Sequence, residues 1–127
     1  MMNGMQMING QAVLFKGVNR HEHDPHKGRT ITVGSMIHDI QLMMQFNLNG
    51  VRNCHYPNNY AWNELCTEFG HYMVDEANIE SHGMMFHKDE TLANYPDWEV
   101  PFMQRMSRMI ARGRNSSAIV PWSVGNE

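Results

Sequence analysis

Acidic and imidazole side chains follow a short apolar run in the middle of the sequence. Residues 72–74 are long enough for one buried strand. Asp75 and Glu76 come at once, and Glu80 and His82 follow a few residues later. A buried strand that ends in such groups is typical of active sites in α/β barrels. Carboxylate and imidazole also bind divalent metals, but a polar, solvated loop is the plain alternative, so this stretch alone favours function only modestly.

Three further segments repeat this pattern of an apolar run followed by polar side chains. The sequence predicts strands over 12–18, 50–53, 72–77 and 118–124, separated by three helices. The helices are predicted over about 36–46 with Ser35 as the N-cap, over 60–69 before Gly70, and from a cap at Asp97 to Gly113. This alternating order predicts parallel strands joined by right-handed helical connections. Polar groups at the strand ends are therefore expected to meet at one edge of the sheet.

The polar groups at these ends leave two kinds of chemistry open. Paired carboxylates suit glycosidic bond cleavage, and carboxylates with imidazoles suit metal-assisted hydrolysis. On spacing alone, a structural role for His21 and His55 is as consistent as a functional one. Cys54 precedes His55 directly, and because neighbouring strand residues point to opposite faces, a Cys–His pair is not expected. The sequence has no zincin motif and no glycine-rich nucleotide-binding loop.

Length, charge and cysteine content limit the partners and the compartment to be expected. The length of 127 residues suits one domain, and the net charge of −3 gives no reason to expect nucleic acid or an anionic membrane as partner. No apolar run approaches the roughly 20 residues of a membrane span. The N-terminus has no signal-peptide pattern, and Cys54 and Cys66 are too few for a disulfide framework, so we expect a cytoplasmic protein. Because the sequence stops at Glu127 directly after an apolar run, we expect part of a larger domain.

Four motifs in order resemble the bacterial β-galactosidases of glycoside hydrolase family two. They are GVNRHEHDP, VRxxHYPN, VDEANIESHG and WSVGNE, and the resemblance covers about residues 10–127. The family's catalytic domain is a (β/α)8 TIM barrel. The resemblance therefore implies that residues 1–127 are the N-terminal half of that α/β barrel, with about four parallel strands, three helices and no second domain. It also implies hydrolysis of terminal β-D-galactosides, of the lactose type, by a retaining double displacement.

The resemblance assigns roles to particular side chains. Glu127 matches the catalytic acid/base, while the nucleophile belongs to a later strand outside this chain. His21, His55 and Asn126 match residues that contact the galactosyl group. Arg52 matches an arginine that positions the nucleophile. We therefore expect the isolated chain to have little or no glycosidase activity.

The resemblance also implies cofactors and partners. Glu80, His82 and Glu127 match the ligands of an active-site Mg²⁺, and the family leaves room for Na⁺, whose ligands cannot be identified in this sequence. The expected partners are a galactoside substrate, the remainder of the barrel or polypeptide, and further copies in a homo-oligomer. Two alternatives stay open, namely a non-catalytic barrel fragment or interaction module, and a metal-dependent hydrolase of another barrel family.

Departures from the family's pattern lie in the scaffold rather than in the site motifs. The run before the last strand carries Gly113 and Ser116 in place of the usual residues, and Pro121 falls inside that strand. His71 stands where an apolar residue is expected. Proline donates no hydrogen bond to a sheet, and the other changes replace residues that the family's scaffold usually has. Together these changes predict a weakened scaffold.

Overall fold

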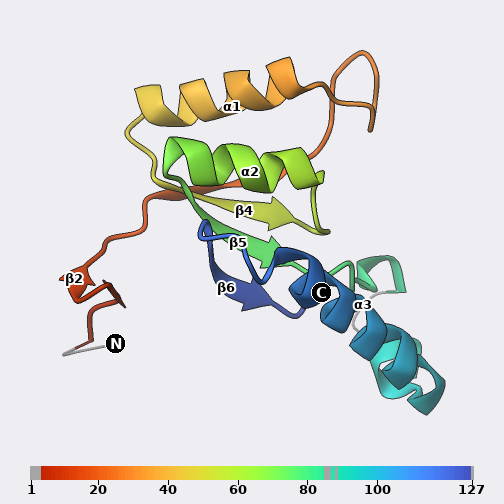
Figure 1. The fold of residues 1–127 in the computed structure, drawn as a ribbon. Helices are drawn as coiled ribbons and strands as arrows, with labels where there is room; N and C mark the ends of the chain where they lie inside the picture. Colours follow the sequence, from red (N-terminus) through yellow and green to blue (C-terminus); the bar gives the residue numbers. More distant parts are fainter. Residues whose placement is uncertain (1–3, 85–86, 88, 127) are drawn as a thin grey trace.

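A four-stranded parallel sheet organises the computed structural model, which describes residues 4–84, 87 and 89–126 (Figure 1). Its strands, in spatial and chain order, are β3 (Gly17–His21), β4 (Gly50–Cys54), β5 (Tyr72–Glu76) and β6 (Ile119–Ser123). The connections contain α1 (Val33–Gln45), α2 (Tyr60–Phe69) and α3 (Glu99–Gly113). Short 3-10 helices lie at η1 (His82–Met84), η2 (Leu92–Asn94) and η3 (Pro96–Trp98), and β1 (Met7–Ile8) pairs antiparallel with β2 (Gln11–Ala12). The predicted parallel β/α order is confirmed.

The core lies between one face of the sheet and helices α1 and α2. In Figure 1 these two helices run side by side over the strands. The buried apolar residues that pack together come from both layers, and they are Met36, Ile40, Met43, Val51, Trp62, Leu65, Cys66, Met73 and Ala118. Helix α3 contributes little to this core, because Met109 is buried but Met103 is 61% exposed. No helix in the described part of the chain is long and apolar enough to cross a membrane.

The predicted first strand is wrong in its position. Instead of spanning 12–18, the strand of the main sheet begins at Gly17 and includes two polar residues, Asn19 and Arg20. Arg20 is buried because other elements satisfy its guanidinium: Nε donates to Asp39 at 2.8 Å, and Nη1 donates to Asn58 at 2.7 Å. The same group stacks 3.9 Å from the ring centroid of Trp62. These tertiary partners allow an arginine to occupy a strand that a hydrophobic pattern does not predict.

Two of the predicted helix caps are also wrong. Helix α1 begins earlier than predicted because Thr32 is the N-cap. Its side chain accepts a hydrogen bond from the Ser35 amide, and the Ser35 hydroxyl accepts one from the Thr32 amide, so Ser35 forms the other half of a capping box. Helix α3 begins after Trp98, and Asp97 lies in the preceding 3-10 turn. The predicted end of α2 is confirmed, since Gly70 adopts a left-handed conformation with φ of 72°.

The unusual scaffold residues have different structural consequences. Pro121 lies in a register shift of β6 between the pairs Met73–Ile119 and Asp75–Trp122, and a bulge of this kind accommodates a residue without an N–H. A Cβ at Gly113 would lie 2.7 Å from side-chain atoms of Ile119 and Trp122, so a larger residue there would need these side chains to shift. His71 is buried, and among the described residues neither of its ring nitrogens has a hydrogen-bond partner. A buried imidazole without hydrogen bonds costs free energy, so at His71 the weakening of the scaffold stays our prediction.

Candidate active site

A hydrogen-bonded network at the C-terminal ends of the strands centres on Glu76. The Glu76 side chain is fully buried at the end of β5. Arg52 of β4 donates to both carboxylate oxygens, from Nε to Oε2 at 2.7 Å and from Nη2 to Oε1 at 2.9 Å. His55 Nδ1 lies 2.8 Å from Oε1, and the Ser123 hydroxyl donates to Oε2 at 2.8 Å. One carboxylate thus joins three neighbouring strands.

The network determines the ionisation of Glu76. Burial raises the pKa of this carboxyl, but hydrogen bonds from Arg52, His55 and Ser123 outweigh burial and hold the pKa below its ordinary value. The carboxylate is therefore ionised near neutral pH and balances the charge of Arg52. Because Glu76 ionises more readily in the folded chain, its contribution to stability is present above its ordinary pKa and is lost as pH falls through the lowered one.

The backbone and side chain of Asn126 are fixed by the loop that follows β5. The Asn126 amide donates to the carbonyl of Ile79 at 2.9 Å, and its side-chain Nδ2 donates to Glu80 at 3.1 Å. Its Oδ1 accepts from Arg52 Nη2 at 3.0 Å. Gly125 allows this close approach, because it has φ of 144° and a Cβ there would lie 2.4 Å from the Ile79 oxygen. Asn126 therefore joins Arg52 to the acidic loop.

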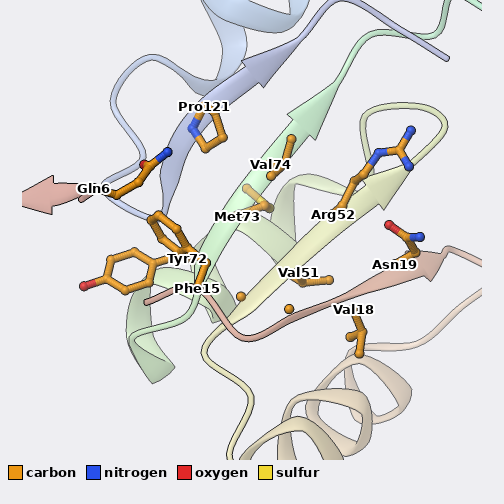
Figure 2. Close-up of a pocket in the computed structure, with 12 residues that line it drawn as sticks. Gln6, Phe15, Val18, Asn19, Val51, Arg52, Tyr72, Met73, Val74 and Pro121 are labelled. Atoms are coloured by element: carbon orange, nitrogen blue, oxygen red, sulfur yellow. The ribbon is translucent and has the colours of Figure 1, made fainter. Parts of the chain in front are cut away.

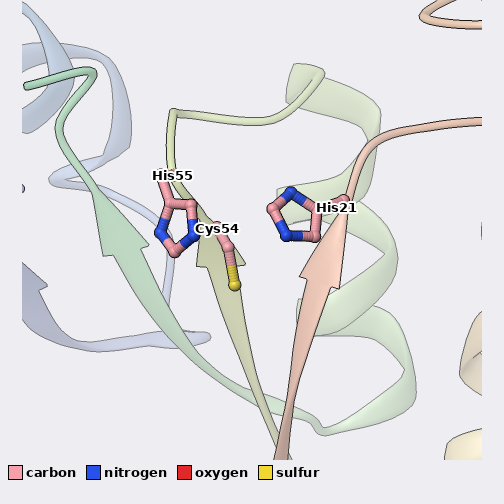
Figure 3. Close-up of side chains that lie close together, drawn as sticks. All are labelled: His21, Cys54 and His55. Carbon is pink, nitrogen blue, oxygen red and sulfur yellow. The ribbon is translucent and has the colours of Figure 1, made fainter. Parts of the chain in front are cut away.

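Two imidazoles meet at the ends of β3 and β4. The rings of His21 and His55 lie edge to face, with centroids 5.2 Å apart (Figure 3). The Cys54 sulfur is beside them, and ligand atoms of all three residues lie within 4.8 Å of one another. The Cys54 thiol donates to the carbonyl of Arg52 at 3.5 Å and not to an imidazole, so the expectation that Cys54 and His55 form no Cys–His pair is not contradicted. The His55 ring nevertheless lies near the sulfur, because His55 is beyond the end of β4, where the alternation of faces within a strand no longer applies.

The structure thus brings together most of the residues predicted for the site. Arg52, His55 and Asn126 share one network, and His21 lies beside His55. Glu80 joins the network through Asn126. Glu127 lies outside the described residues, so its roles as acid/base and metal ligand stay predictions. Sequence reasoning missed Glu76 as the centre of the site. The register of the two parallel strands explains its place. Arg52 pairs with Val74, and Glu76, two residues after Val74, is on the same face of the sheet and so lies beside Arg52.

Two of the predicted Mg²⁺ ligands, Glu80 and His82, are among the described residues. Glu80 is exposed in the loop after β5 and presents a carboxylate, the ligand type that Mg²⁺ prefers. His82 begins η1 and is also exposed, and its imidazole is a less usual ligand for this hard ion than a carboxylate. Glu80 therefore fits the predicted ion by ligand type, and the Mg²⁺ site itself stays a prediction.

A cavity of about 630 Å³ lies on the sheet face away from α1 and α2 (Figure 2). Apolar side chains supply most of its lining, among them Phe15, Val18, Tyr72, Val74 and Pro121. Apolar walls suit the packed interior of an α/β barrel better than a hydroxylated sugar. We therefore place the candidate site at the strand ends and not in this cavity.

Asp75, the neighbour of Glu76, is a buried acid with incomplete partners. Its Oδ1 accepts from Asn53 at 3.0 Å, but Oδ2 accepts no hydrogen bond from any described residue. The Arg112 guanidinium is 3.9 Å from Oδ2. Burial raises the pKa of the Asp75 carboxyl, against the effects of Asn53 and Arg112. Ionisation of Asp75 is therefore less favourable in the folded chain than in the unfolded one.

Replacing Asp75 with asparagine is expected to stabilise the chain at pH 7. A carboxyl with a raised pKa contributes stability below its ordinary pKa and loses it as pH rises through the raised one, whereas an amide does not titrate. Urea unfolding at pH 4 and pH 7 measures this, and the gain from Asp75→Asn should be larger at pH 7. Asp97→Asn, at an exposed position, is the control with no such gain. A gain that does not change with pH would contradict the explanation.

Four parallel strands in a β/α order, with polar groups gathered at their C-terminal ends, define part of an α/β barrel. The chain matches the family described as "Glycosyl hydrolases family 2, TIM barrel domain" over residues 1–127 and belongs to that family.

The chain is similar to known glycosidases over nearly its whole length. It is 48% identical over 127 residues to a β-galactosidase of Psychromonas ingrahamii, and the alignment covers 100% of this chain and 12% of that protein. It is 52% identical over 124 residues to a β-galactosidase of Yersinia enterocolitica, covering 98% of this chain and 12% of that protein. A solved β-glucuronidase of Ruminococcus gnavus superposes with a TM-score of 0.84 at 30% identity, over 97% of this chain and 20% of that one. The chain thus spans about an eighth of the length of these curated relatives.

Proposed function

We propose that this chain supplies the acid/base part of the active site of a retaining β-galactosidase that cleaves terminal, lactose-type β-D-galactosides. The network of Arg52, Glu76, His55 and Asn126 at the strand ends carries this proposal, because it fixes the polar groups that a sugar site needs. The names of the relatives that are about half identical to this chain support galactose as the sugar. The remainder of the barrel, with the nucleophile, lies outside this chain.

In the first step, the external nucleophile attacks the anomeric carbon while Glu127 gives its proton to the departing oxygen. In the second step, Glu127 takes a proton from water, which attacks the anomeric carbon and releases galactose. Asn126, His21 and His55 hold the galactosyl group. Arg52 is itself held by Glu76 and orients the nucleophile. The fixed position of Asn126 supports this assignment, because Glu127 follows it directly in the chain.

We further propose that Glu80, His82 and Glu127 hold Mg²⁺ in the complete enzyme. A bound cation favours the carboxylate form of a neighbouring acid and so adjusts its acidity. The thiols of Cys54 and Cys66 are free, which supports a reducing compartment, and we propose the cytoplasm. A homo-oligomer remains our expectation for the complete enzyme.

Solved structures of a Ruminococcus gnavus β-glucuronidase are also similar to this chain, which makes a glucuronide the competing substrate. A chimaera tests the two, with this chain replacing the matched segment of the Psychromonas ingrahamii β-galactosidase. We expect kcat/KM on a chromogenic β-galactoside to exceed that on the matched glucuronide by at least about 100-fold, since a site whose polar groups bind one substrate can reject another by about 10⁴-fold. The isolated chain is the control and should hydrolyse neither. Preference for the glucuronide, or turnover by the isolated chain, would contradict the proposal.

A further inference from the structure

The cluster of His21, Cys54 and His55 contains a thiol, that of Cys54, to which the glycosidase proposal gives no role. His21 and Cys54 are the last residues of neighbouring strands and are paired in the register of the sheet. Their ligand atoms and those of His55 all lie within 4.8 Å of one another. Thiolate and imidazole are ligands for borderline-soft metals such as Zn²⁺. This cluster is separate from Glu80 and His82, which lie beyond β5.

The orientation of His55 favours metal binding. A carboxylate only accepts hydrogen bonds, so the 2.8 Å contact with Glu76 places the His55 proton on Nδ1. The lone pair is then on Nε2, and Figure 3 shows a ring nitrogen of His55 on the side of Cys54 and His21. A histidine whose second nitrogen donates to a carboxylate is a common arrangement in zinc sites. The hydrogen bond to Glu76 thus orients the His55 ring so that Nε2 can bind a metal ion.

We propose that His21, Cys54 and His55 bind a borderline-soft divalent cation such as Zn²⁺, with one coordination position left open. Tetrahedral zinc with bonds of about 2.0–2.3 Å brings its ligand atoms to roughly 3.3–3.7 Å from one another. The exposed side chain of His21 can rotate to close the remaining distance. On binding, the Cys54 sulfur gives its proton to solvent and coordinates as thiolate.

The surrounding charges are compatible with a cation. Arg52 lies close to the site, with Nη2 at 3.3 Å from His55 Nδ1, but the ionised Glu76 offsets its charge. The thiolate of Cys54 then supplies the negative charge that the ion requires. Mg²⁺ prefers oxygen ligands in an octahedral arrangement, so this site should discriminate against it. The inference goes beyond the proposed function, because the ion would occupy imidazoles there assigned to the galactosyl group.

Calorimetric titration of the chain with Zn²⁺ tests the site. We expect one equivalent to bind, and Cys54→Ser and His21→Gln each to weaken the affinity by about tenfold or more. His38→Gln, an exposed histidine on α1, and Cys66→Ala, a core thiol, are the matched controls and should bind as the parent chain does. Co²⁺ should give a thiolate charge-transfer band that Cys54→Ser lacks, and excess Mg²⁺ should not displace Zn²⁺.

Two results would contradict the proposed Zn²⁺ site. One is the absence of Zn²⁺ binding, and the other is equal affinity in the parent chain and in His21→Gln, whose exposed side chain can be replaced without disturbing the core. If Cys54→Ser does not fold, as judged by circular dichroism, the His21 variant and the cobalt spectrum of the parent chain decide. All these measurements report metal binding, so the site can fail while the glycosidase proposal stands, and the reverse.

Discussion

Replacing Arg52 with methionine should lower the free energy of unfolding of the chain by about 3 kcal/mol. The arginine makes two hydrogen bonds to Glu76, whose side chain is fully buried. Without it, an ionised carboxylate remains buried with only His55 and Ser123 as partners. Leaving one charge of a buried pair uncompensated costs more than the pair contributes when intact. Urea unfolding followed by circular dichroism at pH 7 measures the loss.

Two further variants separate charge from geometry. Arg52→Lys keeps the positive charge but cannot make the paired hydrogen bonds, so it should lose an intermediate amount. Combining Arg52→Met with Glu76→Gln should recover part of the loss, because no buried charge remains. The difference between Arg52→Met and the parent chain should also shrink as pH falls through the lowered pKa of Glu76. An Arg52→Met chain as stable as the parent would contradict the role given to this pair.

Replacing Glu127 with glutamine in the chimaera should reduce kcat on lactose by about 10³-fold. Lactose has a poor leaving group that needs a proton in the first step, and glutamine cannot supply one. An activated aryl galactoside departs without protonation, so its first step should be much less affected. Initial rates on the two substrates measure the difference. Glu64→Gln, at an exposed position on α2, is the matched control and should leave both rates unchanged.

Local patterns in the sequence predict the parallel order and the end of α2, because helix periodicity and Gly70 act over a few residues. The start of β3 could not be predicted in this way. Arg20 occupies that strand through partners 19 and 38 residues away, Asp39 and Asn58. A pattern of apolar residues places the strand too early, over 12–18, since it does not show which buried polar group will be satisfied by distant segments.

The candidate site shows the same limit. Motifs identified Arg52, His55 and Asn126, and the structure joins all three in one network. Motifs did not show that Glu76 holds this network together, because its role depends on the register between β4 and β5. Nor did they place Cys54 beside His21, which requires the paired ends of β3 and β4.

The most direct test of the central claim, that this chain provides the acid/base and not the nucleophile, is the product that Glu127→Gln forms with azide. In the chimaera carrying this variant, an activated aryl galactoside should still form the galactosyl-enzyme, which water attacks slowly without a base. Azide is an anion and needs no base, so it should restore turnover and give β-galactosyl azide, the product of two inversions. Formation of α-galactosyl azide would contradict the claim, because one inversion means that Glu127 is the nucleophile.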